Sequence, residues 1–443
     1  MEIQQDKPIF VLGLDSTPPR LLFEEFKGEL SNIESVIEYK QPIKSTHPPI
    51  TIPAWISMST GKTPGELGLY GFRHRRIGSY DDLYIANSKL IRTKTLWASI
   101  GQRGGNSIVV GVPPSYPPKP MKGVLISDFI TPDASKPYTW PRSLKQEIER
   151  LLGGPYMFDV EFRSHDKDRI KKGLWRMTEL QFKVLKHLAK TKKWTLFFYV
   201  LIGTDRVQHA FWKYYDPSHP KHPERSKYED VIPEYYKLVD RLFGELLNVL
   251  PKETQFIVVS DHGAKPMKGA FAVNEWLIQE GYLALKKYPS EHGVDLKPDM
   301  IDWSKTTAWG WGGYYARIFL NVKDREPIGI IDKEEVPGII EELKKKLSSI
   351  KGPGGEPWNT NVYTPSELYP EVNGDPPDLI VYFDDLYWRS AGTIGWKDPY
   401  LEENDRGPDD AVHDWYGVLG SSVEPYEKPV TITELFTKGY RLL

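Results

Sequence analysis

The stretch from Trp194 to His209 reads WTLFFYVLIGTDRVQH. Its first part is a short, continuous apolar run rich in aromatic residues, which is typical of a strand buried on both faces of a sheet. The run stops at Asp205, and open α/β sheets place their ligand sites at the carboxyl ends of their strands. This stretch therefore predicts a buried central strand and a functional edge of the sheet beside it.

The same pattern recurs along the chain and sets the expected fold class. Five further apolar runs indicate buried strands, over residues 9–15, 106–112, 123–129, 255–263 and 378–383. Helical periodicity lies between them, at residues 143–152, 174–190, 231–250 and 337–350. Strands that alternate with helices favour an α/β fold, in which a mostly parallel sheet is covered by helices on both faces.

The composition limits the partners and the chemistry. The chain has 443 residues, of which 40% are hydrophobic, enough to bury a large core. Its 58 basic and 60 acidic residues give a net charge of -2, so no overall field favours a nucleic-acid polymer or a membrane surface. Cysteine is absent, which leaves His, Asp, Glu and hydroxyl groups as ligands and nucleophiles. The first apolar run is too short for a signal peptide and has no basic n-region, so we expect a cytoplasmic protein.

The stretch TIPAWISMSTG, residues 51–61, predicts a helix that begins with a hydroxyl group. Pro53 suits the first helical turn, and Gly61 suits the left-handed position that ends a helix. Thr51 has two interpretations: it caps the helix, or it is a nucleophile that attacks phosphorus beside a metal ion. Under the second interpretation, the N-terminus of the helix would also favour an anionic substrate.

Carboxylates and imidazoles follow the apolar runs or lie in the loops after them. Six of them are candidate metal ligands: Asp15, Asp205, His209, Asp261, His262 and His413. Each has a structural alternative when taken alone, as a turn cap, a surface pair or an ordinary loop histidine. With Thr51 they form a set of oxygen and imidazole donors that suits two zinc-like ions.

In their order along the chain these motifs resemble the type I phosphodiesterase / nucleotide pyrophosphatase family of the alkaline phosphatase superfamily. That order is a strand-end Asp, a Thr before x-Pro and a helix ending in Thr-Gly, Asp-x-x-x-His, Ser-Asp-His-Gly and a late His. The resemblance implies an alkaline-phosphatase-like three-layer sandwich with a cap insertion. We expect the catalytic domain over residues 1–264 and 386–443, and the cap, with returning core strands, over residues 265–385.

The resemblance also implies a two-metal site. One ion would be held by Asp205, His209 and His413, and the other by Asp15, Thr51, Asp261 and His262. Zinc is the expected metal, with manganese or another divalent metal as the alternative. In this family a threonine attacks phosphorus and forms a phospho-threonine intermediate, which water then hydrolyses. We therefore expect a metal-dependent hydrolase of phosphodiester or pyrophosphate bonds in nucleotide-type or other small substrates.

One departure from the family concerns the substrate. The family's nucleotide pyrophosphatases have an Asn shortly after the nucleophile helix, whereas this chain reads GLYGFRHRR at residues 68–76. Arg73, His74 or Arg75 could replace that Asn as a phosphate-binding group, or could belong to a solvated basic loop. Arg206, inside the Asp-x-x-x-His motif, could bind phosphate or pair with a neighbouring acid.

An aromatic stretch in the expected cap offers a second substrate contact. The stretch is TTAWGWGGYYARIFLN, residues 306–321. Its aromatic side chains could stack on a base or cover an apolar group, and core packing is the alternative. The candidates are Trp309, Trp311, Tyr314 and Tyr315.

Other functions remain as alternatives at this point. A phosphomonoesterase, a phosphonate hydrolase or a phosphomutase of the same superfamily would use the same site. A sulfatase is disfavoured, because TIPAW has a threonine and lacks the arginine of the sulfatase motif. A non-catalytic metal-binding module is the rival from a different class, and the complete set of seven candidate ligands argues against it.

Overall fold

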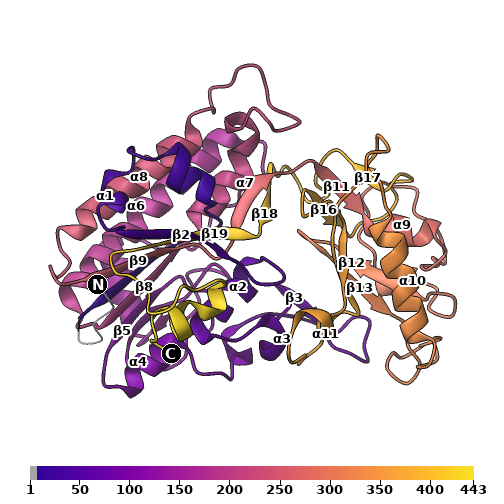
Figure 1. The fold of residues 1–443 in the computed structure, drawn as a ribbon, viewed down its shortest axis with the longest axis horizontal. Helices are drawn as coiled ribbons and strands as arrows, with labels where there is room; N and C mark the ends of the chain where they lie inside the picture. Colours follow the sequence, from indigo (N-terminus) through magenta and orange to yellow (C-terminus); the bar gives the residue numbers. More distant parts are fainter. Residues whose placement is uncertain (1–6) are drawn as a thin grey trace. The chain divides into compact units, whose positions relative to one another are not determined.

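The computed structural model describes residues 7–443 (Figure 1). The chain forms two compact units. The first contains the chain up to Leu67, Ala86–Lys265 and His413–Leu443, and the second contains Gly68–Ile85 and Pro266–Val412. The segment before residue 7, on which the expectation of a missing leader partly rests, lies outside the described residues.

The first unit is built on an eight-stranded sheet. Its order is β2 (Tyr39–Lys44), β19 (Tyr416–Ser421), β9 (Gln255–Val259), β1 (Ile9–Leu14), β8 (Leu196–Leu201), β5 (Ser107–Val110), β6 (Gly123–Ile126) and β7 (Thr139–Trp140). The strands from β9 to β6 are parallel, and β2, β19 and β7 pair antiparallel with their neighbours at the two edges. The mostly parallel sheet predicted from the apolar runs is confirmed.

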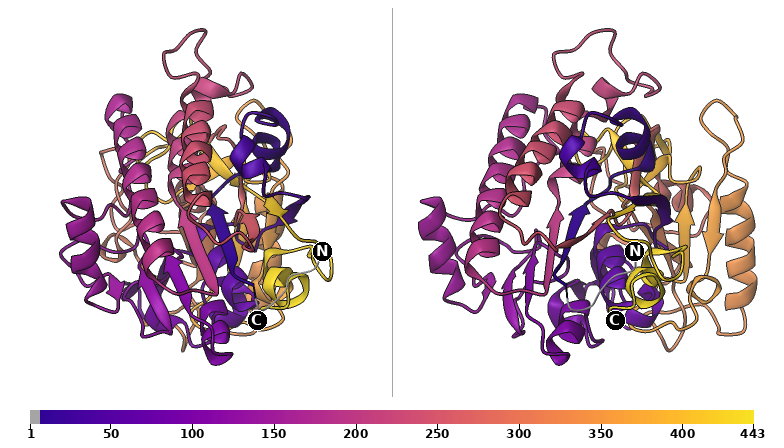
Figure 2. Two further views of the ribbon diagram at one scale, coloured as in Figure 1. Left: turned by 90° about the vertical axis from the view of Figure 1, so that its left-hand side faces the viewer. Right: turned by 60° about the vertical axis from the view of Figure 1, so that its left-hand side comes forward.

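Helices cover both faces of this sheet, as Figures 1 and 2 show. One face carries α1 (Ser31–Glu34), α5 (Leu144–Leu152), α6 (Lys167–Thr191), α7 (Gly203–Tyr215) and α8 (Val231–Leu247). The other carries α2 (Thr51–Thr60), α4 (Leu96–Gln102) and the short turns near the C-terminus. Alternate residues of β1 therefore enter different cores: Val11 packs with Trp55 and Met58 of α2, and Phe10 contacts Phe243 of α8 with the two ring planes tilted. The three-layer α/β architecture expected from the sequence is present.

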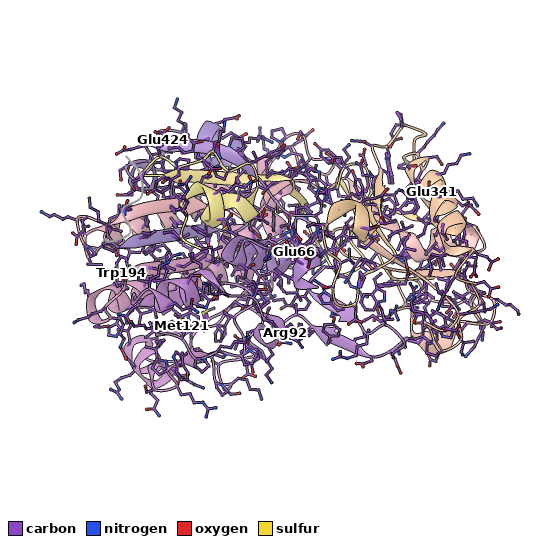
Figure 3. The ribbon with its side chains drawn as sticks, turned by 60° about the horizontal axis from the view of Figure 1, so that its bottom comes forward. Glu66, Arg92, Met121, Trp194, Glu341 and Glu424 are labelled. Atoms are coloured by element: carbon purple, nitrogen blue, oxygen red, sulfur yellow. The ribbon has the colours of Figure 1, made fainter. Side chains whose placement is uncertain are left out.

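The second unit is built mainly from antiparallel strands. A four-stranded sheet has the order β12 (Ala308–Trp311), β13 (Ala316–Leu320), β15 (Leu379–Tyr382) and β14 (Asn361–Tyr363). A second sheet joins β16 (Trp388–Ala391), β11 (Gly269–Ala272) and β17 (Tyr400–Leu401), and β3 (Arg73–Arg75) pairs with β4 (Leu83–Ile85). The helices α9 (Val273–Gln279), α10 (Val336–Ser348) and α11 (Pro365–Leu368) complete the unit. The outer face of α10 is charged, and Glu341 on it is exposed (Figure 3).

Two features of the second unit differ from the expected arrangement. The apolar run at residues 378–383 forms β15, which pairs with β13 and β14 and does not belong to the eight-stranded sheet. The unit also extends to Val412 and includes Gly68–Ile85, whereas the expected insertion covers residues 265–385. A buried apolar run specifies a strand but does not specify its partners, because every central strand has the same pattern.

The largest difference between a helix boundary and the sequence pattern is at the start of α6. The pattern at residues 174–190 belongs to α6, which begins earlier, at Lys167, after Asp166 caps it by accepting a hydrogen bond from the Arg169 N–H. Among residues 7–443, no helix combines the length and apolarity that a membrane span requires.

Candidate metal centre

The parallel register of the central strands brings the predicted ligands to one edge of the sheet. Leu14 at the end of β1 pairs with Leu201 at the end of β8, and Gly13 pairs with Val259 at the end of β9. The segments that follow these three strands therefore start side by side. They carry five of the predicted residues, and α2 and β18 (Ala411–Asp414) supply the other two. All seven are buried in the first unit: Asp15, Thr51, Asp205, His209, Asp261, His262 and His413.

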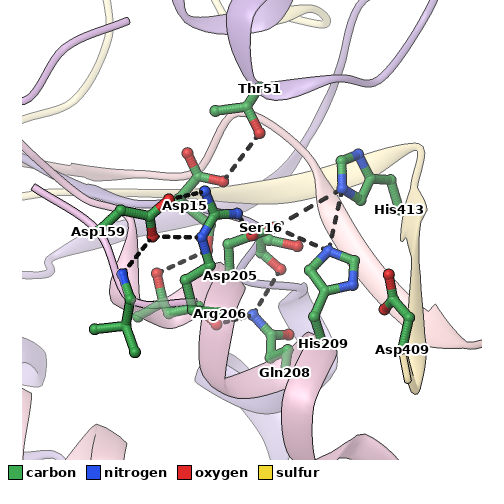
Figure 4. Close-up of polar contacts among 12 residues, drawn as sticks. Asp15, Ser16, Thr51, Asp159, Asp205, Arg206, Gln208, His209, Asp409 and His413 are labelled. Carbon is green, nitrogen blue, oxygen red and sulfur yellow. Dashed lines mark hydrogen bonds and ion pairs between the residues drawn. The ribbon is translucent and has the colours of Figure 1, made fainter. Parts of the chain in front are cut away.

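The side chains of this set form one continuous cluster, part of which Figure 4 shows. The imidazole Nε2 of His209 lies 3.2 Å from Asp205 Oδ1 and 3.3 Å from Nε2 of His413. The rings of His413 and His262 are stacked with their centroids 3.9 Å apart. His262 Nε2 in turn lies 3.1 Å from Asp261 Oδ2. Residues far apart in the sequence thus place their donor atoms together.

Thr51 is the first residue of α2, and its hydroxyl faces this cluster. The residue that precedes the helix is Ile50, and no side chain caps the helix. The Thr51 Oγ1 atom instead lies 3.3 Å from His262 Nε2 and 3.5 Å from Asp15 Oδ1. Gly61 ends the helix with a φ of 68°, as expected for a left-handed C-terminal residue. The helix-cap interpretation of Thr51 is therefore wrong in this structure.

Each of the three carboxylates has one oxygen held by a donor of the fold. Trp55 Nε1 donates to Asp15 Oδ2 at 2.7 Å, and Arg206 Nη1 donates to Asp205 Oδ2 at 2.6 Å. The backbone N–H of Ser16, a residue with a φ of 63°, donates to Asp261 Oδ1 at 3.2 Å. The second oxygens of Asp205 and Asp261, Oδ1 and Oδ2 respectively, are buried and have no hydrogen-bond partner.

Two of the histidines are oriented by backbone carbonyl groups. His262 Nδ1 lies 2.9 Å from the Gly263 carbonyl oxygen, and His413 Nδ1 lies 2.8 Å from the Pro49 carbonyl oxygen. A carbonyl oxygen only accepts, so each Nδ1 carries the proton and each Nε2 presents a lone pair to the cluster. This arrangement, in which the outer nitrogen donates to a carbonyl, is the usual one for metal-binding histidines.

The electrostatics of the cluster also suit a divalent cation. Burial and the neighbouring carboxylates raise the pKa of Asp15 and of Asp261 well above the ordinary value. Burial lowers the pKa of His262 to about 4, and burial together with the neighbouring imidazoles lowers that of His413. Burial acts to raise the pKa of Asp205, but His209 and Arg206 outweigh it and lower that pKa. The imidazoles of His262 and His413 are therefore neutral at pH 7, the form that binds metals, and a cation would stabilise the crowded carboxylates.

The donor atoms fall into two overlapping groups that could each hold an ion. One group contains Asp205, His262 and His413, and the other contains Asp15, Asp261 and His262. Within each group the donor atoms lie within 4.8 Å of one another. The residues present therefore fit divalent metal binding, because the unpartnered carboxylate oxygens and the imidazole lone pairs converge.

Arg206, a candidate phosphate-binding residue, is occupied by two carboxylates. Its Nε and Nη2 atoms donate to the two oxygens of Asp159 at 2.7 and 2.8 Å, in addition to the bond from Nη1 to Asp205. The guanidinium carbon lies 5.2 and 4.8 Å from the ring centroids of Phe129 and Phe162. The contacts favour the ion-pair alternative for this residue.

The other substrate-binding candidates belong to the second unit. Arg75 is buried and donates from Nη1 and Nη2 to both oxygens of Glu326. Trp309 and Tyr315 are buried in that unit's core. The core-packing alternative is therefore favoured for Trp309 and Tyr315. Arg75 forms a buried ion pair, which differs from the solvated basic loop that was its alternative. The assignments of Arg73, which is exposed, and of Trp311 and Tyr314, which are half-buried, stay predictions.

Three residues that hold the cluster were missed by the sequence analysis. Trp55 follows Thr51 by four residues, so helical spacing could have placed both on one face of α2. Ser16 directly follows Asp15, and it is the backbone N–H of Ser16 that binds Asp261. Asp159 lies in the irregular segment between α5 and α6, and no local pattern connects it with Arg206.

The fold and this set of carboxylates and imidazoles define a metal-dependent hydrolase with an alkaline-phosphatase-like fold. More specifically, the chain belongs to the type I phosphodiesterase / nucleotide pyrophosphatase family, whose model matches residues 9–409. A comparison with curated proteins gives no match.

Solved structures share this fold at low sequence identity. Phosphonoacetate hydrolase from Sinorhizobium meliloti 1021, in complex with phosphonoformate, is 15% identical with a TM-score of 0.63, and the match covers 97% of this chain and 94% of that one. Murine ectonucleotide pyrophosphatase / phosphodiesterase 5 is 13% identical with a TM-score of 0.53, over 97% and 93% of the two chains. An inactive variant of the murine protein in complex with AMP has a TM-score of 0.54 at 13% identity, over 98% and 93%.

Proposed function

We propose that this protein hydrolyses phosphodiester or pyrophosphate bonds of small, nucleotide-type substrates, with Thr51 as the nucleophile. The observation that carries the proposal is the position of the Thr51 hydroxyl. It lies at the start of α2, caps no helix, and is directed to His262 and Asp15 of the buried cluster. A hydroxyl with no structural role, beside a cluster of metal-binding groups, has the environment of an activated nucleophile.

The reaction divides into two displacements at phosphorus. In the first, Thr51 Oγ1 forms a bond to phosphorus as the bond to the leaving oxygen breaks, and the hydroxyl proton passes through solvent to the leaving group. In the second, the oxygen of a water molecule bonds to phosphorus, the bond from phosphorus to Oγ1 breaks, and a proton of that water restores the Thr51 hydroxyl. The positive end of the α2 dipole, at whose start Thr51 lies, favours the negative phosphate group in both steps. The intermediate replaces one difficult displacement by two easier ones.

The metals of the proposal are two zinc ions. One would be held by Asp205, His209 and His413, and the other by Asp15, Thr51, Asp261 and His262. When bound, the ions would lower the pKa of the threonine hydroxyl and stabilise charge on the leaving oxygen. The set of imidazole and carboxylate donors without sulfur supports zinc, and manganese is the alternative that metal analysis would identify.

The substrate class has one specific competitor. A structural relative is a phosphonoacetate hydrolase, and the relative in complex with AMP is a pyrophosphatase / phosphodiesterase. A phosphonate hydrolase is therefore the second candidate, ahead of a phosphomonoesterase or a phosphomutase.

We also propose a cytoplasmic location, with no nucleic-acid polymer or membrane as partner. Cell fractionation of the native protein tests the location.

The test compares an aryl phosphodiester, the matching monoester and phosphonoacetate, using protein whose bound metals have been counted. A chelator-treated sample and Thr51→Ala are the controls. Preference for the diester, loss of activity in both controls and about two ions per chain would support the proposal. If the protein prefers phosphonoacetate, the proposed site still holds, but the proposed substrate changes from a phosphodiester to a phosphonate. Full activity of Thr51→Ala would refute the nucleophile, and an unchanged metal content in Asp261→Asn would remove Asp261 from the ligands.

A further inference from the structure

Arg206 lies between a candidate metal ligand and an acid that no motif identified (Figure 4). On one side it binds both oxygens of Asp159, and on the other it binds Asp205 Oδ2. Asp159 is itself fixed, because its Oδ1 also accepts the Val160 backbone N–H at 2.8 Å. The Arg206 side chain is only 11% exposed. The three side chains thus form a chain of charge-assisted hydrogen bonds that runs from the half-buried Asp159 to the buried Asp205.

This chain of hydrogen bonds determines which oxygen of Asp205 faces the cluster. Oδ2 is bound by Arg206, so Oδ1 is the oxygen that lies 3.2 Å from His209 Nε2 and 3.7 Å from His413 Nε2. We propose that Arg206 is a positioning residue, which holds Asp205 in the orientation that binds metal, and that Asp159 is the anchor of Arg206. This inference rests on the metal site of the proposed function.

Charge argues against a direct contact between Arg206 and substrate phosphate. One guanidinium charge is shared by the two carboxylates of Asp159 and Asp205, so the group of three has a net negative charge. A phosphate group would have to displace one of these carboxylates to form a bidentate pair of its own. Displacing Asp205 would release a ligand, and displacing Asp159 would leave a carboxylate that is about one-third exposed without its partner.

The physical benefit of the arrangement is preorganisation. An unrestrained aspartate loses rotamer freedom when it binds an ion, whereas Asp205 is already held in one rotamer before the ion arrives. Partners that orient metal ligands in this way typically change metal affinity by about 10–100-fold when they are removed. We expect an effect of that size for Arg206 and a smaller one for Asp159, which acts only through Arg206.

The experiment measures zinc binding and phosphate binding separately in the full-length protein. Arg206→Met retains the apolar stem, Arg206→Lys retains a charge with fewer hydrogen bonds, and Asp159→Asn weakens the anchor. The control is Arg241→Met, which removes an arginine of α8 whose side chain is 56% exposed. Each variant is stripped with a chelator and titrated with zinc by calorimetry. The dissociation constant of inorganic phosphate is then measured by calorimetry on zinc-saturated protein.

The expected result is weaker zinc binding by about 10–100-fold in Arg206→Met, a smaller loss in Arg206→Lys and Asp159→Asn, and none in the control. The phosphate dissociation constant should change little once zinc is saturating. Normal zinc affinity with weakened phosphate binding in Arg206→Met would overturn the inference and restore the phosphate-binding assignment. If Arg206→Met does not fold, the lysine and asparagine variants decide. Zinc binding is measured without substrate, so failure to hydrolyse diesters would refute the proposed function alone.

Discussion

Two buried arginines, one in each unit, show how a structural ion pair differs from a functional one. In the second unit Arg75 and Glu326 have side chains that are 1% and 0% exposed, and both oxygens of Glu326 accept from Arg75. In the first unit Arg206 binds Asp205 through Oδ2 and leaves Oδ1 without a hydrogen-bond partner. Both arginines pair with a buried carboxylate, but both oxygens of Glu326 have a hydrogen-bond partner, whereas one oxygen of Asp205 has none. The unsatisfied oxygen is the feature that indicates a ligand site.

The largest effect should be on activity and should come from Thr51→Ala, in the buried cluster of candidate metal ligands. Loss of the nucleophile should lower kcat for a phosphodiester by about 10³-fold or more. The melting temperature should change little, because the hydroxyl caps no helix. Steady-state kinetics and thermal unfolding check the two parts, with Thr51→Ser as the matched variant that retains a hydroxyl. A large fall in melting temperature with activity retained would show that Thr51 is structural after all.

Glu326→Ala should have the next largest effect, on stability alone. It leaves the buried Arg75 charge without a carboxylate, which typically costs about 3–5 kcal/mol of unfolding free energy. Urea unfolding followed by tryptophan fluorescence measures the loss, and Glu326→Gln, which keeps an acceptor, should lose less. Metal content under native conditions should equal that of the parent protein. If the variant lost metal while remaining folded, the Arg75–Glu326 pair would not be purely structural, and the contrast with Arg206 would fail.

Asp261→Asn should reveal the repulsion among the carboxylates of the candidate metal cluster. The observable is the pH dependence of the stability of the metal-free protein. Burial and Asp15 raise the folded-state pKa of Asp261, so the metal-free folded state binds more protons than the unfolded state above about pH 4. The contribution of Asp261 to stability is therefore present at low pH and is lost as the pH rises. Asparagine has no such loss, so the metal-free variant should gain stability relative to the parent as the pH rises above about 4.

The slope of this gain is limited to about 1.4 kcal/mol per pH unit for one proton. Urea unfolding of both chelator-treated proteins at several pH values measures it. With excess zinc at pH 7, the parent should become more stable than Asp261→Asn, because the parent binds the ion more tightly. Parallel pH profiles for the two metal-free proteins would contradict the raised pKa.

Trp55→Phe should have the smallest effect on stability and zinc affinity. It tests whether a donor of the fold orients Asp15 as Arg206 orients Asp205. Phenylalanine keeps much of the ring packing against the central sheet and removes only the Nε1 donor to Asp15 Oδ2. We expect a loss of about 1–3 kcal/mol in unfolding free energy for the metal-free protein, since a buried acceptor loses its partner. Zinc affinity should fall modestly. An unchanged affinity would mean that the orientation of Asp15 does not depend on Trp55.

Much of the fold follows from local patterns in the sequence. The runs that became β1, β5, β6, β8 and β9 are apolar and flanked by turn residues, and such runs form buried strands wherever they pair. The run at residues 378–383 has the same character, yet it pairs in the second unit. The donors at the strand ends were recognisable because their spacing is local, as with Asp205 and His209 on one turn of α7.

The sequence by itself determined which groups could bind metal, because the residue types and their places after strands are properties of short segments. Only the tertiary structure decided which atoms face the cluster. The Asp205 oxygen that faces the histidines depends on Asp159, 46 residues away, and the proton on His413 depends on the Pro49 carbonyl. It also decided that Thr51 faces this cluster and is no helix cap. Such contacts join segments that approach only after folding, so no local pattern could encode them.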